Sequence, residues 1–344
     1  MIQFQCDYNE GAHPLILQRL TETNMEQTVG YGEDDYCNQA RELIRQACGN
    51  DNIDVHFLVG GTQTNTTVIA HTLRPYQGVL TAETGHINVH ETGAIESTGH
   101  KVLAIESANG KLTAQQIEEA IQAHRHEDGP EHMVQPGMVY LSFPTEVGTI
   151  YTYSELEAIS TVCRKYSLPL FVDGARLGYG LCSPESDVTL PQLAQLADVF
   201  YIGGTKVGVL FGEAVIITNE MLKRDFRYSI KRHGGMLAKG RLLGLQFATL
   251  FTDNLYMQIA QHAIDEAMRI KAALHEKGIK FLIDSPTNQQ FPIFSNTQLE
   301  ALSLKYRFSI WQRTDEEHIA VRICTSWGTK HENVDQLIED IKGL

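Results

Sequence analysis

A carboxylate, a guanidinium and a lysine follow two short apolar runs in the middle of the chain. The runs Leu170–Val172 and Val199–Ile202 are typical of buried parallel strands, and small residues end each of them. Asp173 and Arg176 come just after the first run, and Lys206 comes just after the second. Because parallel strands meet a ligand at their carboxyl ends, we expect these three side chains to share one site.

These residue types are the ones that pyridoxal 5'-phosphate (PLP) needs. Asp173 would keep the pyridine nitrogen protonated, so that the ring accepts electrons, and Lys206 would hold the cofactor aldehyde as a Schiff base. Burial among apolar residues and glycines would lower the pKa of Lys206 and make its amine nucleophilic. Asp173 could instead form a turn or bind a metal. Arg176 either pairs with Asp173 or, as we favour, binds the ring oxygen of the cofactor.

Two further segments are candidates for cofactor contacts. His86 follows the predicted strand Val79–Ala82, and its ring either packs in the core or lies over the planar cofactor. Gly61 and Thr62 lie between the buried run Val55–Val59 and a predicted helix, where free backbone N–H groups and the helix dipole favour a phosphate. No glycine-rich nucleotide motif occurs in the chain, so neither a dinucleotide nor a nucleotide is expected.

Arg322 lies in an otherwise apolar strand, Ala320–Cys324, near the C-terminus. Burying an arginine without a partner costs several kcal/mol, so it needs an anion. A bidentate contact with a substrate carboxylate explains the arginine better than a core salt bridge.

Composition restricts the class of protein. The 344 residues carry a formal charge of −14, which argues against nucleic-acid binding, and 42% hydrophobic residues are typical of a globular protein. The N-terminus lacks the pattern of a signal peptide, and no run approaches the about 18 apolar residues of a membrane helix. Six scattered cysteines without metal-binding spacing indicate reduced thiols, no metal site and a cytoplasmic location.

The order of the predicted elements indicates an α/β protein with a second, smaller domain. Strands and helices alternate up to about Thr218, which predicts a mostly parallel sheet covered by helices. One of these helices is predicted over Ser154–Tyr166, with Ser154 as N-cap and Glu157 completing a capping box. A single long helix is predicted over Lys239–Lys271. The predicted division is an N-terminal arm and first helix (1–20), a large PLP-binding domain (21–245) and a small α+β domain (246–344).

Four motifs stand in order along the chain: VGGTQTN, TGHINVHETGA, DGAR followed by TK, and VRICTSW. Together they resemble the low-specificity L-threonine aldolases, which belong to the beta-eliminating-lyase branch of fold-type-I PLP enzymes. The resemblance runs from about Asp7 to the C-terminus. It implies a PLP-transferase-like fold with a seven-stranded large domain, and a homodimer or homotetramer with active sites at the subunit interface.

The resemblance also implies a role for each site residue. For the cofactor ring, the Schiff-base lysine is Lys206, the partner of the pyridine nitrogen is Asp173, the ligand of the ring hydroxyl is Arg176 and the stacked histidine is His86. The phosphate ligands are Gly61 and Thr62. Arg322 binds the substrate carboxylate, and Tyr31 reaches the site from its own or a neighbouring subunit.

The chain departs from the family pattern in two places. The family's Glu-Asn-Thr-His segment, whose histidine contacts the substrate hydroxyl, is replaced by Ser142–Glu146, which has no histidine. A second phosphate-binding arginine of the family falls where this chain has Lys231 and Arg232, and the sequence does not decide which of them replaces it.

The sequence therefore predicts a lyase that cleaves the Cα–Cβ bond of a β-hydroxy-α-amino acid, such as L-threonine or L-allo-threonine, to glycine and an aldehyde. His86 or an activated water would take the proton of the hydroxyl. The missing histidine leaves an aminotransferase, a β-eliminating lyase or a racemase as the alternative. A catalytically silent binding protein is a third hypothesis, against which the intact Lys206, Asp173 and Arg322 argue. The substrate side chain, its Cβ stereochemistry and the choice between dimer and tetramer stay open.

Overall fold

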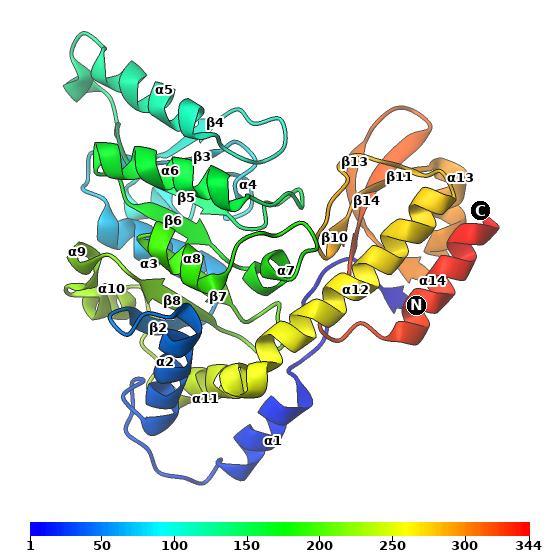
Figure 1. Cartoon of the computed structure of the whole chain (residues 1–344), viewed down its shortest axis with the longest axis horizontal. Coiled ribbons are helices and arrows are strands. Elements are labelled where there is room, and N and C mark those ends of the chain that lie inside the picture. Colours follow the sequence, from blue (N-terminus) through cyan, green and yellow to red (C-terminus); the bar gives the residue numbers. More distant parts are fainter.

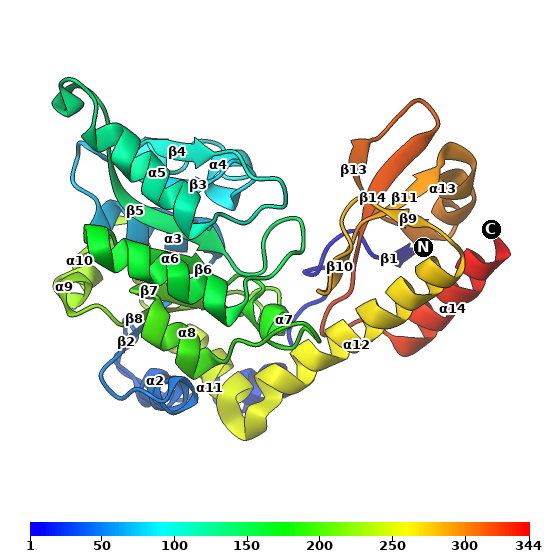
Figure 2. The same cartoon turned by 45° about the horizontal axis from the view of Figure 1, so that its top comes forward.

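The two larger of the chain's three sheets lie in different parts of the molecule, and the long helix α12 (Leu255–Glu276) connects them (Figure 1). The computed structural model describes all of residues 1–344. Figure 2 shows that α12 begins beside α11 (Arg241–Phe251), below the large sheet, and ends beside α14 (His331–Gly343) in the small part. The helix thereby holds the two sheets in one arrangement.

The large sheet is mostly parallel, as the alternation of strands and helices predicts. Only β8 runs antiparallel to its two neighbours, and the other neighbouring pairs are parallel. This confirms the predicted α/β class with a seven-stranded, mostly parallel sheet. In sheet order the strands are β2 (Asp54–Leu58), β8 (Glu213–Ile217), β7 (Val199–Gly203), β6 (Leu170–Asp173), β5 (Gln135–Ser142), β3 (Gln77–Ala82) and β4 (Val102–Ile105).

Helices cover both faces of the large sheet, because its central strands are apolar on both sides. In β5, Val139 and Leu141 belong to one hydrophobic core, and Met138 and Tyr140 belong to the core on the other face. The first core is completed by α1 (Pro14–Glu22), α2 (Asp35–Cys48), α5 (Ala114–Arg125), α6 (Tyr153–Tyr166), α7 (Leu177–Leu181), α8 (Leu190–Leu196) and α11. The second is completed by α3 (Gly61–Thr72), α4 (His86–Val89), α9 (Glu220–Lys223) and α10 (Phe226–Arg232).

The start of α6 corrects the predicted capping box. Thr152, not Ser154, is the N-cap, and its hydroxyl accepts a hydrogen bond from the backbone N–H of Glu155. The Glu155 carboxylate accepts in return from the backbone N–H of Thr152, at 2.8 Å. Two overlapping patterns, Thr-x-x-Glu and Ser-x-x-Glu, stand in this segment, and the threonine pair that begins the helix earlier is the one that forms.

The single helix predicted over Lys239–Lys271 is wrong, because the chain breaks it into two. α11 ends at Phe251, a 3-10 turn, η3 (Thr252–Asn254), follows, and α12 then runs in a new direction (Figure 1). Asp253 and Asn254 both have positive φ angles, of 52° and 58°. These are residue types that adopt the left-handed conformation more readily than most, so the break falls where the backbone can turn.

The small part is an antiparallel sheet packed on α12, α14 and α13 (Asn296–Ser303). The N-terminal strand β1 (Ile2–Gln3) pairs with β12 (Tyr306–Arg307), so the N-terminal arm is tied to this part. The predicted boundary at residue 245 falls inside α11, and the division into domains stays a prediction. The strands of the small sheet are β9 (Lys280–Phe281), β10 (Gln289–Gln290), β11 (Pro292–Ser295), β13 (Ser309–Arg313) and β14 (His318–Cys324).

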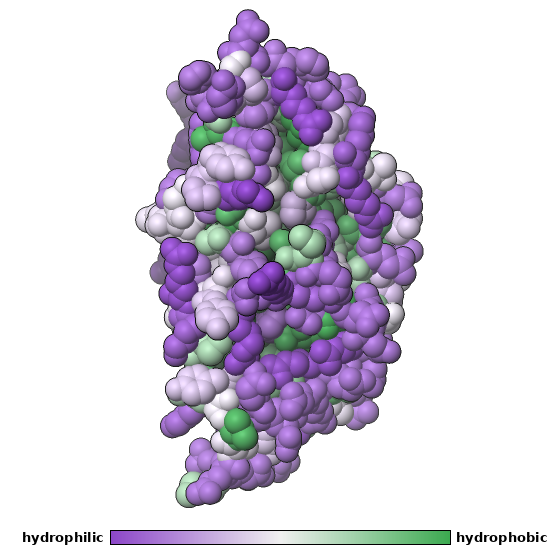
Figure 3. Space-filling view, turned by 90° about the vertical axis from the view of Figure 1, so that its left-hand side faces the viewer, coloured by the Kyte–Doolittle hydropathy of each residue, from purple (hydrophilic) through white to green (hydrophobic).

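The surface of the large part is mostly hydrophilic on the face that lies at the left of Figure 1. Figure 3 shows this face mostly purple, with its hydrophobic residues in small, scattered spots. No helix of the chain has both the length and the apolar character that crossing a bilayer requires.

Two short 3-10 turns complete the elements, η1 (Glu96–Thr98) and η2 (Pro130–His132).

Candidate active site

A cavity of about 760 Å³ lies between the carboxyl ends of the large sheet's strands and the small sheet. Its walls come from both parts, because Trp311 of β13 lines it together with loops that follow β2, β3, β6 and β7. Residues from five separate stretches of the predicted site therefore meet at one place. Seven of the eight predicted site residues line the cavity: Gly61, Thr62, His86, Asp173, Arg176, Lys206 and Arg322.

Asp173 is held at the end of β6 by hydroxyls from the two flanking strands. Tyr140 of β5 and Tyr201 of β7 each donate a hydrogen bond to its carboxylate, the latter at 2.5 Å. Asn65 Nδ2 donates at 3.2 Å and the backbone N–H of Ala175 at 3.0 Å, so Asp173 also forms the predicted turn. Four donors thus surround a buried carboxylate, and none of them is a cation.

The charge state of Asp173 follows from these contacts. Burial acts to raise the pKa of Asp173, but the charge that His86 carries when its ring is protonated and the hydrogen bonds from Tyr140 and Tyr201 together outweigh burial. The net result is a pKa below the ordinary value of an aspartate. The carboxylate is therefore ionised at neutral pH while it faces the cavity without a positive partner in contact.

Lys206 lies in the tight turn between β7 and β8. The Tyr179 hydroxyl donates to its backbone carbonyl at 2.6 Å and so fixes the turn. Burial and the nearby Arg176 charge lower the pKa of Lys206. The buried Glu213, the first residue of β8, also lines the cavity, and burial raises the pKa of its carboxyl to about 7. Both shifts favour neutral side chains, which suits an amine that must act as a nucleophile.

Arg176 pairs with a residue that the sequence reasoning missed. Its Nε and Nη2 donate to the two carboxylate oxygens of Asp7, at 2.6 and 3.0 Å. The suggested ion pair with Asp173 is therefore wrong. Asp7 also accepts from Asn288 Nδ2 at 2.9 Å, so one carboxylate joins the N-terminal arm, the large sheet and the small sheet. Burial opposes ionisation of Asp7, yet the charges of Arg176 and Lys206 and the hydrogen bonds from Arg176 and Asn288 together outweigh burial and lower the pKa to about 2.

His86 begins α4 and is held from two sides. Its backbone N–H donates to Glu146 Oε1 at 2.8 Å, and its ring Nδ1 lies 2.8 Å from Glu91 Oε1. Its side chain keeps 32% of its surface exposed, in the cavity. A second histidine, His90, lies there as well, with its ring 5.6 Å from that of His86. The cavity thus holds two histidines, although the segment Ser142–Glu146 supplies none.

Gly61 and Thr62 form the first turn of α3. No side chain caps this helix, so the backbone N–H groups of its first turn have no acceptor within the helix. A Cβ atom at Gly61 would lie 3.1 Å from the Tyr201 hydroxyl, so the close approach of the two chains requires a small residue. Neither Lys231 nor Arg232 lines the cavity, and both side chains are exposed.

Arg322 of β14 has no carboxylate partner, so the alternative of a core salt bridge is wrong. Its Nη2 donates to the Gln5 carbonyl at 3.2 Å, and its Nη1 lies 3.4 Å from Gln289 Oε1. Its Nε is buried without a partner, and the guanidinium lies 5.5 Å from the centre of the Trp311 ring. A cation held only by neutral groups, and exposed to the cavity, fits a substrate carboxylate.

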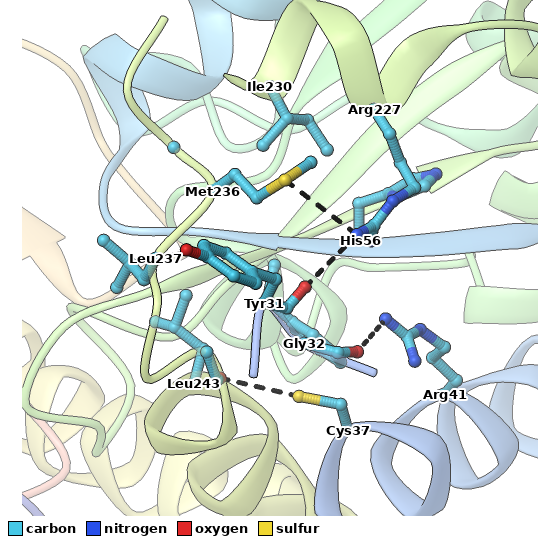
Figure 4. Close-up of a pocket in the computed structure, with 13 residues that line it drawn as sticks. Tyr31, Gly32, Cys37, Arg41, His56, Arg227, Ile230, Met236, Leu237 and Leu243 are labelled. Atoms are coloured by element: carbon cyan, nitrogen blue, oxygen red, sulfur yellow. Dashed lines mark hydrogen bonds between the residues drawn. The ribbon is translucent and has the colours of Figure 1, made fainter. Parts of the chain in front are cut away.

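Tyr31 is the predicted site residue that the structure keeps away from the cavity. It lines a separate pocket of about 30 Å³, where its backbone carbonyl accepts from Arg227 Nη2 (Figure 4). Lys231 Nζ lies 5.2 Å from the centre of its ring. Its side chain is exposed, so Tyr31 does not reach the cavity of its own chain.

Sequence reasoning missed several residues that hold the site together. Tyr140 and Tyr201 stand at buried positions of predicted strands, and their strands flank the one that carries Asp173, which is the signal that could have found them. The others are Asp7, Asn65 and Glu91, which contact residues in other segments, and Glu213, which accepts from the backbone N–H of Gly204 nine positions before it.

Known proteins match this chain over most of its length. A profile of the beta-eliminating lyase family matches residues 7–295. The low specificity L-threonine aldolases of Pseudomonas aeruginosa and of a Pseudomonas species are 32% and 31% identical, each over 99% of this chain and 97% of the relative. The solved structure of Leishmania major threonine aldolase is 43% identical and covers 100% of this chain and 99% of its own, with a TM-score of 0.97. A histidinol-phosphate aminotransferase from Clostridium acetobutylicum, 12% identical, shares the fold, with a TM-score of 0.75 over 100% of this chain and 98% of its own.

Proposed function

Because the chain belongs to the beta-eliminating lyase family, we propose that it is a PLP-dependent aldolase that cleaves L-threonine or L-allo-threonine to glycine and acetaldehyde. Two relatives of similar length carry the name low specificity L-threonine aldolase, and the Leishmania major threonine aldolase has nearly the same fold. The observation that carries the proposal is the ionised, buried Asp173, which faces the cavity with neutral partners only.

The residues of the cavity fit PLP. A buried carboxylate without a cation is costly unless a positive group joins it, and a protonated ring nitrogen would be that group for Asp173. The uncapped first turn of α3 would bind the phosphate through the N–H groups of Gly61 and Thr62. Lys206, with its lowered pKa, is the amine that would bind the aldehyde, and Arg176 lines the cavity where it would contact the ring oxygen.

Bound PLP would supply an electron-accepting ring for the carbon whose bond breaks. The chain's own residues then orient the substrate and move its protons. Arg322 would hold the substrate carboxylate and so fix the direction of the bond to be cleaved. His86 would lie over the ring, and its Nε2 would take the hydroxyl proton, since its Nδ1 is engaged with Glu91. Lys206 would release the glycine product.

We further propose that the protein assembles as a homodimer or homotetramer in which Tyr31 reaches the cavity of a neighbouring copy. Its exposed ring beside Lys231 supports this, since neither side chain serves the cavity of its own chain. The six free cysteines fit a reducing cytoplasm. Light scattering during gel filtration tests the assembly. Tyr31→Ala should lower activity without dissociating the oligomer, and a monomer of full activity would contradict this proposal.

Product analysis tests the reaction. With PLP and L-threonine, the purified protein should release glycine and acetaldehyde in equal amounts, and Lys206→Ala should release neither. A keto acid formed without glycine would instead indicate an aminotransferase or, with ammonia, an eliminating lyase. Formation of D-allo-threonine alone, by inversion at Cα, would indicate a racemase.

A further inference from the structure

Glu91 is a buried carboxylate five positions after His86, the histidine that it contacts. It follows α4, and its side chain has no exposed surface. Its Oε1 accepts two hydrogen bonds, from Asn65 Nδ2 at 2.7 Å and from His86 Nδ1 at 2.8 Å. Its Oε2 is buried without a partner in the chain. No lysine or arginine pairs with Glu91, so its Oε2 atom is buried with neither a cation nor a hydrogen-bond donor beside it.

Asn65 connects Glu91 to Asp173. The amide nitrogen of its side chain donates one hydrogen to Glu91 and the other to Asp173 Oδ2, at 2.7 and 3.2 Å. Its amide oxygen, Oδ1, is buried without a partner. The side chain thus acts only as a double donor between two carboxylates, a task that an amide performs and that a carboxylate of the same shape cannot.

The chain contains a second histidine–glutamate pair, outside the cavity, with which the Glu91–His86 pair can be compared. Glu266 Oε1 lies 2.8 Å from His331 Nδ1, the same separation as in the Glu91–His86 pair. Glu266 Oε2, however, accepts from Arg269 at 2.7 Å, so a cation compensates this carboxylate. Stability alone accounts for the compensated pair. The uncompensated pair costs stability, because a buried acceptor without a partner is unfavourable.

We propose that Glu91 and Asn65 are positioning residues for the reaction assigned above: Glu91 orients the His86 ring, and Asn65 holds Glu91 and Asp173 in a fixed relation. A carboxylate only accepts, so the Glu91 contact places the hydrogen of the imidazole on Nδ1 and leaves Nε2 free. Asn65 therefore links the group that acts on the substrate to the group that holds the ring nitrogen. This inference rests on the proposed function.

A double-mutant cycle tests whether Glu91 acts through His86. The variants are Glu91→Gln, His86→Phe, which keeps a flat ring without nitrogens, and the double variant, with Glu266→Gln as the matched control. We measure kcat and KM for L-threonine, and the Kd of PLP from its visible absorbance. Glu91→Gln should lower kcat about 10- to 100-fold, less than the about 100- to 10,000-fold that general-base catalysis contributes because His86 itself remains, and should change KM and Kd by less than about threefold. On the His86→Phe background it should change kcat by less than about twofold.

Glu266→Gln should keep kcat within about twofold of the unmutated enzyme and lower the Tm. A loss of kcat by the same factor on both backgrounds would overturn the inference, and so would an unchanged kcat in Glu91→Gln. An unmutated protein that binds PLP but releases no acetaldehyde would contradict the proposed function instead. The two failures are therefore distinguishable.

Asn65→Leu, which keeps the shape and removes both donors, provides the second test. Because Asp173 loses one of the hydrogen bonds that stabilise its charge, the Kd of PLP should rise about 10-fold. This measurement still tests the inference if the Glu91→Gln variant does not fold. An unchanged Kd together with an unchanged kcat in Asn65→Leu would overturn the role of Asn65.

Discussion

Asp7 and Asp173 are both buried, with 0% and 4% of their surface exposed, but only one of the two carboxylates contacts a cation. Asp7 is neutralised by the two-pronged contact with Arg176. Asp173 receives four hydrogen bonds from neutral donors. The first is a completed ion pair that joins distant segments. The second faces the cavity with an uncompensated charge, and this difference separates a structural carboxylate from one suited to a cationic ligand.

The largest effect is expected from Asp173→Asn. A neutral amide cannot keep the ring nitrogen protonated, so kcat for L-threonine should fall about 100- to 1,000-fold, as it does when a charge-stabilising group is lost. The free energy of unfolding should change by less than about 1 kcal/mol, because the substitution removes a buried charge that has no cationic partner in contact. Steady-state kinetics and urea unfolding measure both quantities. Near-native turnover would contradict the role of Asp173.

Asp7→Asn should show the reverse pattern. It leaves the Arg176 guanidinium buried without its counter-ion, and breaking a buried ion pair costs about 3–5 kcal/mol. Urea unfolding of the PLP-free protein should therefore show a loss of stability on that scale. If Asp173→Asn proved the more destabilising of the two, the distinction between the carboxylates would fail.

The contribution of the Asp7–Arg176 ion pair to stability should also depend on pH. A carboxyl whose pKa falls from 3.8 to about 2 on folding stabilises the folded state fully above about pH 4, and this contribution is lost as the pH falls towards 2. The shift corresponds to roughly 2 kcal/mol. The stability of the unmutated protein should thus fall more steeply between pH 4 and 2 than that of Asp7→Asn. Parallel curves would contradict the assignment.

The smallest effect is expected from Tyr201→Phe. The substitution removes one of the hydrogen bonds that lower the pKa of Asp173, and one hydrogen bond to a charged group is worth about 1.5 kcal/mol or more. The Kd of PLP should rise about 10-fold. The same change at Tyr151, a buried tyrosine that does not line the cavity and whose hydroxyl accepts from the backbone N–H of Leu112, is the control and should leave the Kd of PLP unchanged.

The sequence alone predicted the sheet and the edge at which the site lies, and the structure confirms the fold. Strand ends are readable because apolar runs such as Leu170–Val172 end in small residues, and parallel strands bring their carboxyl ends together. The roles assigned to the individual site residues stay predictions, although the structure brings all but Tyr31 into one cavity.

What the sequence could not show are the contacts between distant segments. Asp7 and Arg176 are 169 positions apart, and only the folded chain reveals that they pair. The helix break at Asp253 was missed because both flanking segments have helical patterns, and only two left-handed residues separate them. His90 was passed over for a related reason: its place in the cavity depends on the short helix α4.

The most direct test of the central claim is a visible absorbance titration of the PLP-free protein with PLP, with Lys206→Ala and Asp173→Asn alongside. The account predicts a yellow, saturable complex in the unmutated protein and none of that band in Lys206→Ala. It also predicts that Asp173→Asn still binds PLP but turns over L-threonine far more slowly. A protein that shows no saturable absorbance change with PLP would contradict the account.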